Sequence, residues 1–322
     1  MEEANLMKLR EIYQLAVDKG IAKDPRGKDG VEKYLNRLKK NYEELKEEDK
    51  QDFDLEKLTN PYADTRILYG DGDREVKSIL VGIDIDVGEV LLADRLAEKG
   101  KEIDLIIAHH PEGGALAKLN DVMHLQEDIL YSLGVPINIA EGILAPRIQE
   151  VERGLMPINH HRAIDAARIL DIPMMCMHTP ADNNVNQLLI DLMEEKKPET
   201  LREIIKILKE IPEYKHATKL GSEPKIIIGA PQKRVGKIFV DMTGGTGGPK
   251  EAFEKMAIAG VGTIICMHIS ENNRKEAEKH KINVIIAGHM ACDSLGMNLI
   301  LDEYAQNGVE IIPCSGLIRV ER

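Results

Sequence analysis

The 322-residue chain is poor in aromatic side chains, with 3 Phe, 8 Tyr and 0 Trp. Proteins that bind single-stranded nucleic acid usually stack bases on aromatic side chains, so this mode of binding is not expected. Basic residues are also in the minority, since 43 Lys and Arg stand against 55 Asp and Glu and give a formal net charge of −12. A surface with this charge repels nucleic acid and anionic membranes, and we expect neither as a partner.

Long apolar runs and paired cysteines are absent as well. No segment approaches the roughly 18–20 apolar residues of a membrane span, and residues 1–20 mix charged and apolar residues at helical spacing instead of resembling a signal peptide. The 4 cysteines form no CxxC motif, which argues against a structural zinc knot or an iron–sulfur cluster. We therefore expect a cytoplasmic protein with free thiols. Its hydrophobic fraction of 43% is sufficient for a folded core.

The order of predicted elements indicates an α/β fold with a helical N-terminal extension. Apolar residues at three-to-four spacing predict helices in residues 1–60, and turn residues crowd positions 58–76. Apolar runs of buried-strand length then alternate with helical patterns, which is typical of parallel sheets covered by helices. We place a first α/β lobe at 61–220, with a helical insertion near 115–170, and a second at 221–322. The predicted strands are 78–85, 103–110, 172–178, 225–229, 237–242, 263–268 and 283–289.

The two predicted lobes repeat each other in sequence. One strand ends at His178 with Asp182 four residues later, and another ends near His289 with Asp293 four residues later. The short motifs CMH and IIA(H/G)H also occur once in each half. Because the elements recur in the same order, we predict two pseudo-equivalent lobes.

Histidine is the residue type that stands out, with 10 copies. Five of them fall at predicted strand ends, and in open α/β sheets ligands bind beyond the carboxyl ends of the strands. Imidazole and carboxylate donors suit zinc, iron, manganese, cobalt or nickel. More donors are present than one tetrahedral ion needs, so we predict two divalent metal ions. The predicted ligands are His109, His110, Asp182, His289 and Asp293.

Two further features have alternative interpretations. His178 and His268 also follow strands and are ligands, residues that orient a ligand, or proton carriers, and we assign them as candidate catalytic residues. A glycine-rich stretch, TGGTGG, follows the strand 237–242 and is either a tight turn or a cradle for a substrate anion. Its candidate substrate-binding residues are Thr243, Gly244, Gly245 and Thr246.

Residues 75–322 resemble the Nif-three-like family, whose members are often described as GTP cyclohydrolase I type 2. The resemblance is carried by LIIAHHP, HTPADNNVN, TGGTGG and AGHMACDSLGMN, in this order. It implies a dinuclear metal site between two lobes, a toroidal hexamer and the same five ligands. Three features depart from the family: Asp293 stands where Glu is usual, Glu112-Gly113-Gly114 replaces apolar residues, and His268 replaces an acidic residue.

The leading hypothesis is a metal-dependent hydrolase acting on a small substrate, which the resemblance suggests is nucleotide- or pterin-like. The first alternative is a metal-binding or metal-trafficking protein without catalysis. The second is a regulatory partner that docks through its N-terminal helices. The resemblance also implies that the chain assembles into a homo-oligomer.

Overall fold

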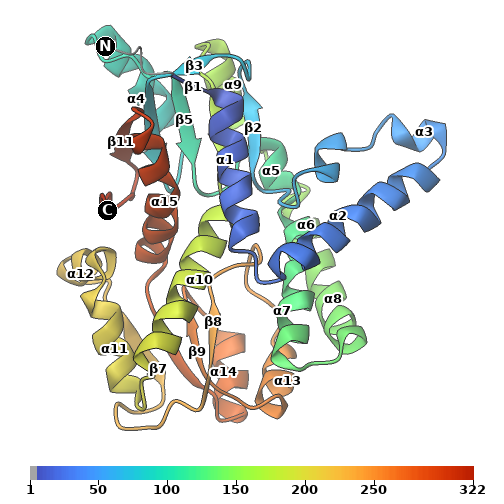
Figure 1. Cartoon of the computed structure of the whole chain (residues 1–322), viewed down its shortest axis with the longest axis vertical. Coiled ribbons are helices and arrows are strands. Elements are labelled where there is room, and N and C mark those ends of the chain that lie inside the picture. Colours follow the sequence, from blue (N-terminus) through green and yellow to red (C-terminus); the bar gives the residue numbers. More distant parts are fainter. Residues whose placement is uncertain (1–5) are drawn as a thin grey trace.

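Two sheets, one in each lobe, organise the chain in the computed structural model, which describes residues 6–322 (Figure 1). The first sheet has five strands in the order β11-β4-β5-β6-β2. Four of them run parallel, and the edge strand β2 pairs antiparallel with β6. The strands are β2 (Arg66–Tyr69), β4 (Ser78–Gly82), β5 (Leu105–Ala108), β6 (Met174–Cys176) and β11 (Glu310–Cys314).

The second sheet repeats this plan with four strands in the order β7-β10-β9-β8. Strands β8, β9 and β10 are parallel, and the edge strand β7 pairs antiparallel with β10. In each lobe the antiparallel edge strand comes first in the chain, and three parallel strands follow it. The edge strand β7 thus corresponds to β2, and β8, β9 and β10 correspond to β4, β5 and β6. This match confirms the predicted two pseudo-equivalent α/β lobes. The strands are β7 (Lys225–Ile228), β8 (Lys237–Asp241), β9 (Val261–Cys266) and β10 (Asn283–Ile286).

Helices cover both sheets and fill the connections. The N-terminal segment holds α1 (Leu9–Ala22), α2 (Gly27–Glu44), α3 (Glu47–Lys50) and the 3-10 helix η1 (Leu55–Leu58). The first lobe continues with α4 (Val87–Glu98), α5 (Gly113–Ala117), α6 (Leu119–Val122), α7 (Leu125–Leu133), α8 (Ile137–Leu155), α9 (Arg162–Ile169), α10 (Thr179–Lys196), α11 (Leu201–Glu210) and α12 (Pro212–Lys219). The second lobe has α13 (Ala252–Ile258), α14 (Glu271–Lys279) and α15 (His289–Gln306). The segment 115–170, predicted as a helical insertion, is occupied by helices α5 to α9 and the loops between them.

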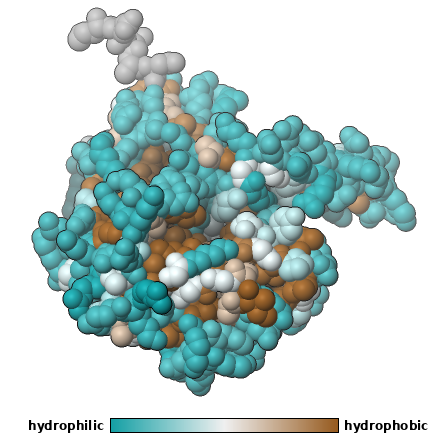
Figure 2. Space-filling view, turned by 60° about the horizontal axis from the view of Figure 1, so that its bottom comes forward, coloured by the Kyte–Doolittle hydropathy of each residue, from teal (hydrophilic) through white to brown (hydrophobic). Residues whose placement is uncertain are grey.

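The N-terminal helices differ in how they pack. Leu9 and Ile12 of α1 are fully buried in the same core cluster as strand β4, and a short antiparallel pair, β1 (Met7–Lys8) with β3 (Glu75–Val76), ties the start of α1 to the first lobe. Helix α2 buries only Val31 and projects from the body as an arm (Figures 1 and 2).

Seen from the second-lobe end, the surface is mostly hydrophilic, with apolar side chains gathered in its middle (Figure 2).

Helices α10 and α15 pack against each other between the sheets. Their contact is so close that a Cβ atom at Gly296 would stand 2.3 Å from the carbonyl oxygen of Ala181. Only glycine allows this approach of two backbones. Helix α10 begins directly after β6 and helix α15 directly after β10, which are inner strands of their sheets, so the contact brings the two strand ends together.

Two elements differ from the sequence prediction. Strand β2 lies inside the turn-rich segment 58–76, where no strand was predicted. Its first residue, Arg66, is buried and donates to the carbonyl oxygen of Thr65 at 2.8 Å. Strand β11 falls in the segment assigned to the second lobe, yet it pairs with β4 in the first sheet. Among the described residues, no helix is long and apolar enough to cross a membrane.

Candidate metal centre

The five predicted ligands and His178 converge at the facing ends of the two sheets. His109 and His110 directly follow β5, and His178 is the residue that precedes the first turn of α10. Asp182 lies on that first turn, and the corresponding positions of α15 are His289 and Asp293. Residues four apart on a helix share one face, so each helix presents an imidazole and a carboxylate together.

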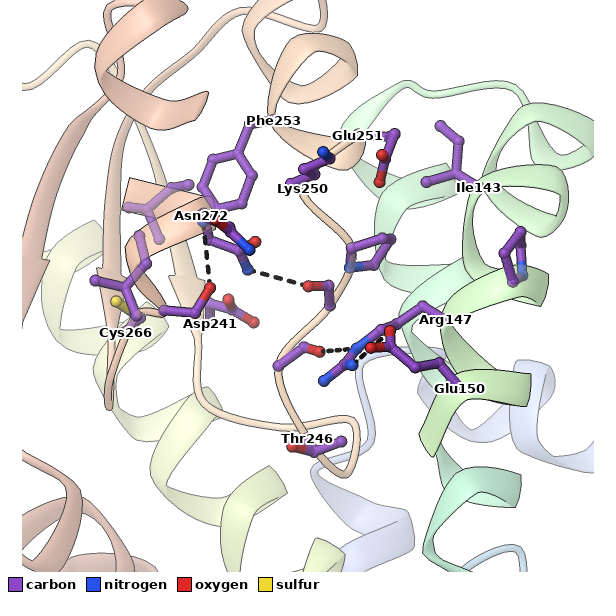
Figure 3. A pocket seen from close by; sticks show the side chains of 18 of the residues that line it. Ile143, Arg147, Glu150, Asp241, Thr246, Lys250, Glu251, Phe253, Cys266 and Asn272 are labelled. Atoms are coloured by element: carbon purple, nitrogen blue, oxygen red, sulfur yellow. Dashed lines mark hydrogen bonds and ion pairs between the residues drawn. The ribbon is translucent and has the colours of Figure 1, made fainter. Parts of the chain in front are cut away.

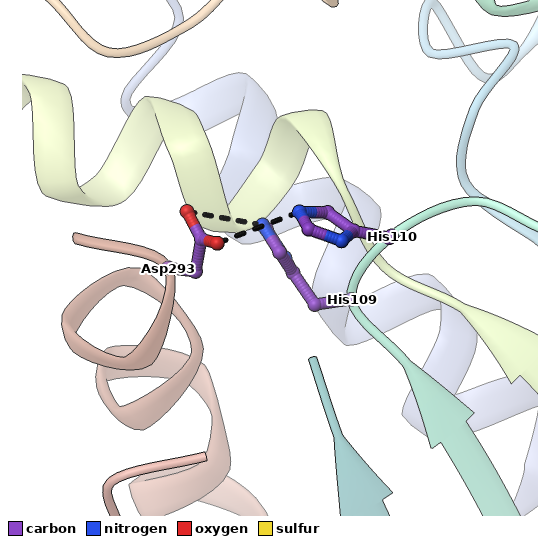
Figure 4. A group of neighbouring side chains, drawn as sticks. All are labelled: His109, His110 and Asp293. Carbon is purple, nitrogen blue, oxygen red and sulfur yellow. Dashed lines mark ion pairs between the residues drawn. The ribbon is translucent and has the colours of Figure 1, made fainter. Parts of the chain in front are cut away.

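Asp293 is the centre of a first group of donors. Its Oδ1 lies 3.6 Å from Nε2 of His109, and its Oδ2 lies 3.5 Å from Nε2 of His110 and 3.5 Å from Nε2 of His289. The ring nitrogens of His109 and His110 turn toward the carboxylate (Figure 4). Donors that each stand about 2.0–2.2 Å from one ion lie about 3.0–3.6 Å from each other. The separations therefore fit shared coordination better than direct hydrogen bonds.

Asp182 forms a second group beside the first. Its Oδ1 lies 3.5 Å from Nε2 of His109, and its Oδ2 lies 3.6 Å from Nε2 of His178. His109, His178 and Asp182 can hold one ion, and His109, His110 and Asp293 can hold one ion. His109 belongs to both sets and stands between the two carboxylates. His178, predicted as a catalytic residue, is thus placed among the possible ligands.

The buried polar atoms of this cluster indicate what it is built to bind. Nε2 of His109, Oδ1 of Asp182 and both carboxylate oxygens of Asp293 are buried and have no hydrogen-bond partner within residues 6–322. Leaving buried polar atoms without partners is costly, and native proteins rarely do so. A cation at this position would satisfy all four atoms, so the residues present fit a metal site.

A second layer of contacts fixes the rings. Nδ1 of His178 lies 2.7 Å from Oδ2 of the fully buried Asp64, which also accepts a hydrogen bond from Oγ1 of Thr179 at 2.6 Å. Nδ1 of His110 lies 2.7 Å from Oδ1 of Asp84, and Nδ1 of His109 lies 3.1 Å from the carbonyl oxygen of Met177. Such partners orient a ligating imidazole so that its Nε2 faces the ion.

The charges of the cluster are strongly coupled. Burial, reinforced by the neighbouring carboxylates, raises the pKa of Asp182 to about 7. Burial lowers the pKa of His109, whereas the carboxylates of Asp182 and Asp64 outweigh burial at His178 and raise its pKa to about 9. The surrounding imidazoles outweigh burial at Asp293 and hold its pKa below the ordinary range. Without an ion the cluster retains protons, and metal binding would release them.

One side of the cluster is open. His289 is 39% exposed, and the centre of its ring lies 5.0 Å from the ring centre of His268, which is exposed. His268 also lines a cavity of about 750 Å³ in the second lobe (Figure 3). The cavity therefore adjoins the open side of the cluster through His268.

The glycine-rich stretch has two kinds of contact. Thr243 is buried and donates to Oδ1 of Asn183 at 2.7 Å, while the carbonyl oxygens of Gly244 and Thr246 accept from Nε2 of Gln126 at 2.7 and 2.6 Å. Thr246 lines the cavity. Gly244 and Gly245 have φ values of +106° and +85°, which favour glycine. The next helix, α13, begins at Ala252. A substrate role for residues 243–246 stays a prediction.

Two residues that hold the ligands escaped the sequence analysis. Asp64 lies in the turn-rich segment before β2, and Asp84 lies between β4 and α4. Aspartate is common in turns for local reasons, so neither residue carried a signal of its own. The surrounding sequence NPYAD also contains no histidine or cysteine that could form a metal-binding motif with Asp64.

No family model and no curated protein matches the chain. Among solved structures, the NIF3 superfamily protein from Sphaerobacter thermophilus is similar with a TM-score of 0.76, at 22% identity over 97% of this chain and 99% of that one. Reduced HcgD from Methanocaldococcus jannaschii is similar with a TM-score of 0.52, at 16% identity over 82% of this chain and 93% of that one. These likenesses show the fold. The shared fold confirms the resemblance that the histidine and glycine motifs carry.

Proposed function

We propose that this chain, which has the fold of NIF3 superfamily proteins, is a metal-dependent hydrolase of a small substrate. The observation that carries the proposal is the set of buried, unpartnered nitrogen and oxygen atoms at the junction of the two lobes. A hydrolase needs such a cluster next to a space for its substrate, and the cavity beside His268 provides that space.

The donor set supports two ions. One would be held by His110, His289 and Asp293, and the other by His178 and Asp182. Nε2 of His109 faces both carboxylates and could complete either set, but it has one lone pair and could bind only one ion. Nitrogen and carboxylate donors without thiolate favour zinc, iron, manganese, cobalt or nickel. Bound divalent ions supply Lewis acidity that lowers the pKa of water and polarises an electrophilic carbon or phosphorus.

The surrounding residues have distinct roles in this proposal. Asp64 and Asp84 orient the imidazoles of His178 and His110 through their Nδ1 atoms. His268, exposed between the cluster and the cavity, carries protons to or from the substrate. A nucleotide- or pterin-like substrate is suggested by the resemblance to the Nif-three-like family.

The test is to purify the protein, quantify its metal and assay hydrolysis of a panel of nucleotides and pterins. We expect activity that chelation removes and that metal restores. His109→Ala is expected to lose metal and activity together, while His216→Ala, a change on the surface helix α12, keeps both. Full activity in metal-free protein would disprove the proposal.

The alternative of a metal-trafficking protein is favoured by one observation, the exposure of His289 at the open side of the cluster. It predicts fast, reversible metal exchange with no turnover of any compound in the panel. The homo-oligomer, a hexamer by resemblance, is also a proposal, and light scattering of the purified chain measures it directly.

A further inference from the structure

A row of imidazole rings leads from the surface of the protein into the metal centre. The ring centre of His268, which is exposed, lies 5.0 Å from that of His289, and the ring centre of His289 lies 5.3 Å from that of His110. The next ring inward is His109, at 5.3 Å from His110. Side-chain exposure falls along the row, from 39% at His289 to 27% at His110 and 1% at His109. The row therefore has one end in solvent and the other among the buried donors.

The spacing of these rings is that of imidazoles that share an ion. Two imidazole nitrogens at about 2.0–2.1 Å from one tetrahedral ion place their ring centres about 5 Å apart. The pair His268–His289 and the pair His289–His110 both have this separation. Because His289 belongs to both pairs, an ion held by the outer pair could pass to the inner pair while His289 stays bound to it.

The repeat between the lobes places His268 at the position of a ligand. His110 is the second residue after β5, and His268 is the second residue after β9, the corresponding strand of the second lobe. His110 belongs to a group of donors that can hold one ion, whereas no such group found among residues 6–322 includes His268. His268 thus has the placement of a ligand but stands one ring outside the centre.

The cavity at the outer end of the row has more acidic than basic side chains in its lining. Its charged residues are Glu150, Asp241, Glu251, Arg147 and Lys250. Arg147 is already paired, because its Nη1 donates to Oε2 of Glu150 at 2.8 Å (Figure 3). Asp241 lies beside Cys266 in the sheet, two residues before His268, and forms no ion pair or side-chain hydrogen bond within the described part of the chain. Its negative charge attracts cations to the end of the row at which His268 stands.

We propose that His268 and His289 form an entry site for the divalent ions of the metal centre. These two imidazoles bind an ion from solvent first, and His110 and Asp293 then replace His268 as its partners while His289 stays bound. The geometry allows this exchange, since Oδ2 of Asp293 lies 3.5 Å from the Nε2 atoms of both His110 and His289. The inference rests on the metal centre of the proposed function but not on hydrolysis.

An entry ligand changes the rates of metal uptake and release without changing the affinity. His268 stands outside both donor groups of the centre, so its removal leaves the loaded protein with all of its ligands. The dissociation constant is then unchanged, and the rates of uptake and release must fall by the same factor. Loss of a group that only orients a ligand weakens metal binding about 10–100-fold. Loss of one of two donors at the entry site is therefore expected to slow uptake at least about tenfold.

The experiment mixes metal-free, full-length protein rapidly with cobalt(II) and follows the visible absorption of the bound ion. His268→Gln is expected to slow uptake at least about tenfold, and to slow removal by excess chelator by the same factor. Its dissociation constant, measured by competition with a chromogenic chelator, is expected to equal that of wild type. His268→Glu restores fast uptake, because it has the shape of the glutamine variant but supplies a carboxylate ligand.

His280→Gln is the matched control, because His280 lies in the same lobe, pairs with Glu276 and does not line the cavity. It is expected to keep both rates and the dissociation constant. Unchanged uptake in His268→Gln overturns the inference. An increased dissociation constant in His268→Gln also overturns it, because His268 would then be a ligand of the loaded centre. Equal slowing in His268→Gln and His268→Glu contradicts it as well, since metal ligation by the side chain would not matter.

The same proteins separate this inference from the proposed function. Loading that depends on His268, without hydrolysis of any compound in the panel, would support the entry site and contradict the hydrolase. Metal-dependent hydrolysis with equal loading rates in wild type and His268→Gln would support the hydrolase and contradict the entry site. The turnover of fully loaded His268→Gln measures the proposed proton transfer by His268 separately from loading.

Discussion

Replacing Asp293 by asparagine tests the metal centre with the smallest change of shape. Asp293 is fully buried, and its two oxygens face the Nε2 atoms of His109, His110 and His289 at 3.5–3.6 Å. Asparagine keeps the size but removes the negative charge and turns one acceptor into a donor. A donor aimed at imidazole ligands opposes a cation at the same place.

The expected loss of stability in Asp293→Asn follows from the linkage between metal binding and folding, since an ion that binds only the folded protein stabilises it. Loss of a partner that merely orients a ligand reduces metal affinity about 10–100-fold, so loss of the ligand itself is expected to cost about 100-fold or more. Metal at a concentration of 100 times its dissociation constant stabilises wild type by about 2.7 kcal/mol, whereas a 100-fold weaker site gains only about 0.4 kcal/mol. With an unfolding entropy of about 2.1 cal/mol/K for each of 322 residues, the difference corresponds to about 3 °C in Tm.

The assay is thermal unfolding of metal-free protein with and without added metal, monitored by circular dichroism. The quantity compared is the increase in Tm on adding metal, which does not depend on how stable the metal-free variant is. Glu303→Gln on the same helix is the control, because Glu303 pairs with Lys19 outside the cluster. An Asp293→Asn protein that gains as much Tm from metal as wild type would refute the assignment.

Three further substitutions test other parts of the account. Asp64→Asn keeps the packing but is expected to weaken metal binding about 10–100-fold, measured by competition with a chromogenic chelator, because it no longer fixes an imidazole. Gly296→Ala is expected to lower the unfolding free energy in urea by about 1–3 kcal/mol, because the new methyl group meets the backbone of Ala181. Cys292→Ala is expected to leave metal content unchanged in elemental analysis, because the thiol bonds to a tyrosine hydroxyl outside the cluster.

Each of these has its own contradicting result. An Asp64→Asn protein with wild-type affinity would mean that the imidazole is oriented by packing alone. Gly154→Ala, in helix α8 with open space around its Cβ position, is the control for Gly296→Ala and is expected to be neutral or stabilising. Equal stability changes for the two glycine variants would contradict the close helix contact. Loss of metal in Cys292→Ala would make the thiol a ligand.

The strands were predictable because burial leaves a local mark. Strands β4 and β5 are buried along their whole length and appear in the sequence as uninterrupted apolar runs. Strand β2 has no such mark. It is four residues long, begins with Arg66, and is placed by pairing with β6, about a hundred residues later. Strand β11 lies in an apolar run near the C-terminus that was not among the predicted strands, and its sheet is decided by pairing with β4 across most of the chain.

The same distinction applies to the metal centre. His109 and Asp293 stood out because each follows a strand, which is a local pattern. Asp64 did not, because its role depends on a ring 114 residues away. The cavity was likewise invisible in sequence, since Arg147 on α8 looked like any charged residue of an amphipathic helix. Ligands with local signals were found, and the residues that orient them required the fold.

The central claim is that the junction between the lobes binds divalent metal through its histidines and aspartates. The most direct measurement is elemental analysis of protein purified without added metal, combined with anomalous scattering from its crystals at the absorption edge of the metal found. We predict about two ions per chain, with His109 lying between their positions. A protein that binds no divalent metal, or binds it away from Asp182 and Asp293, would contradict the account.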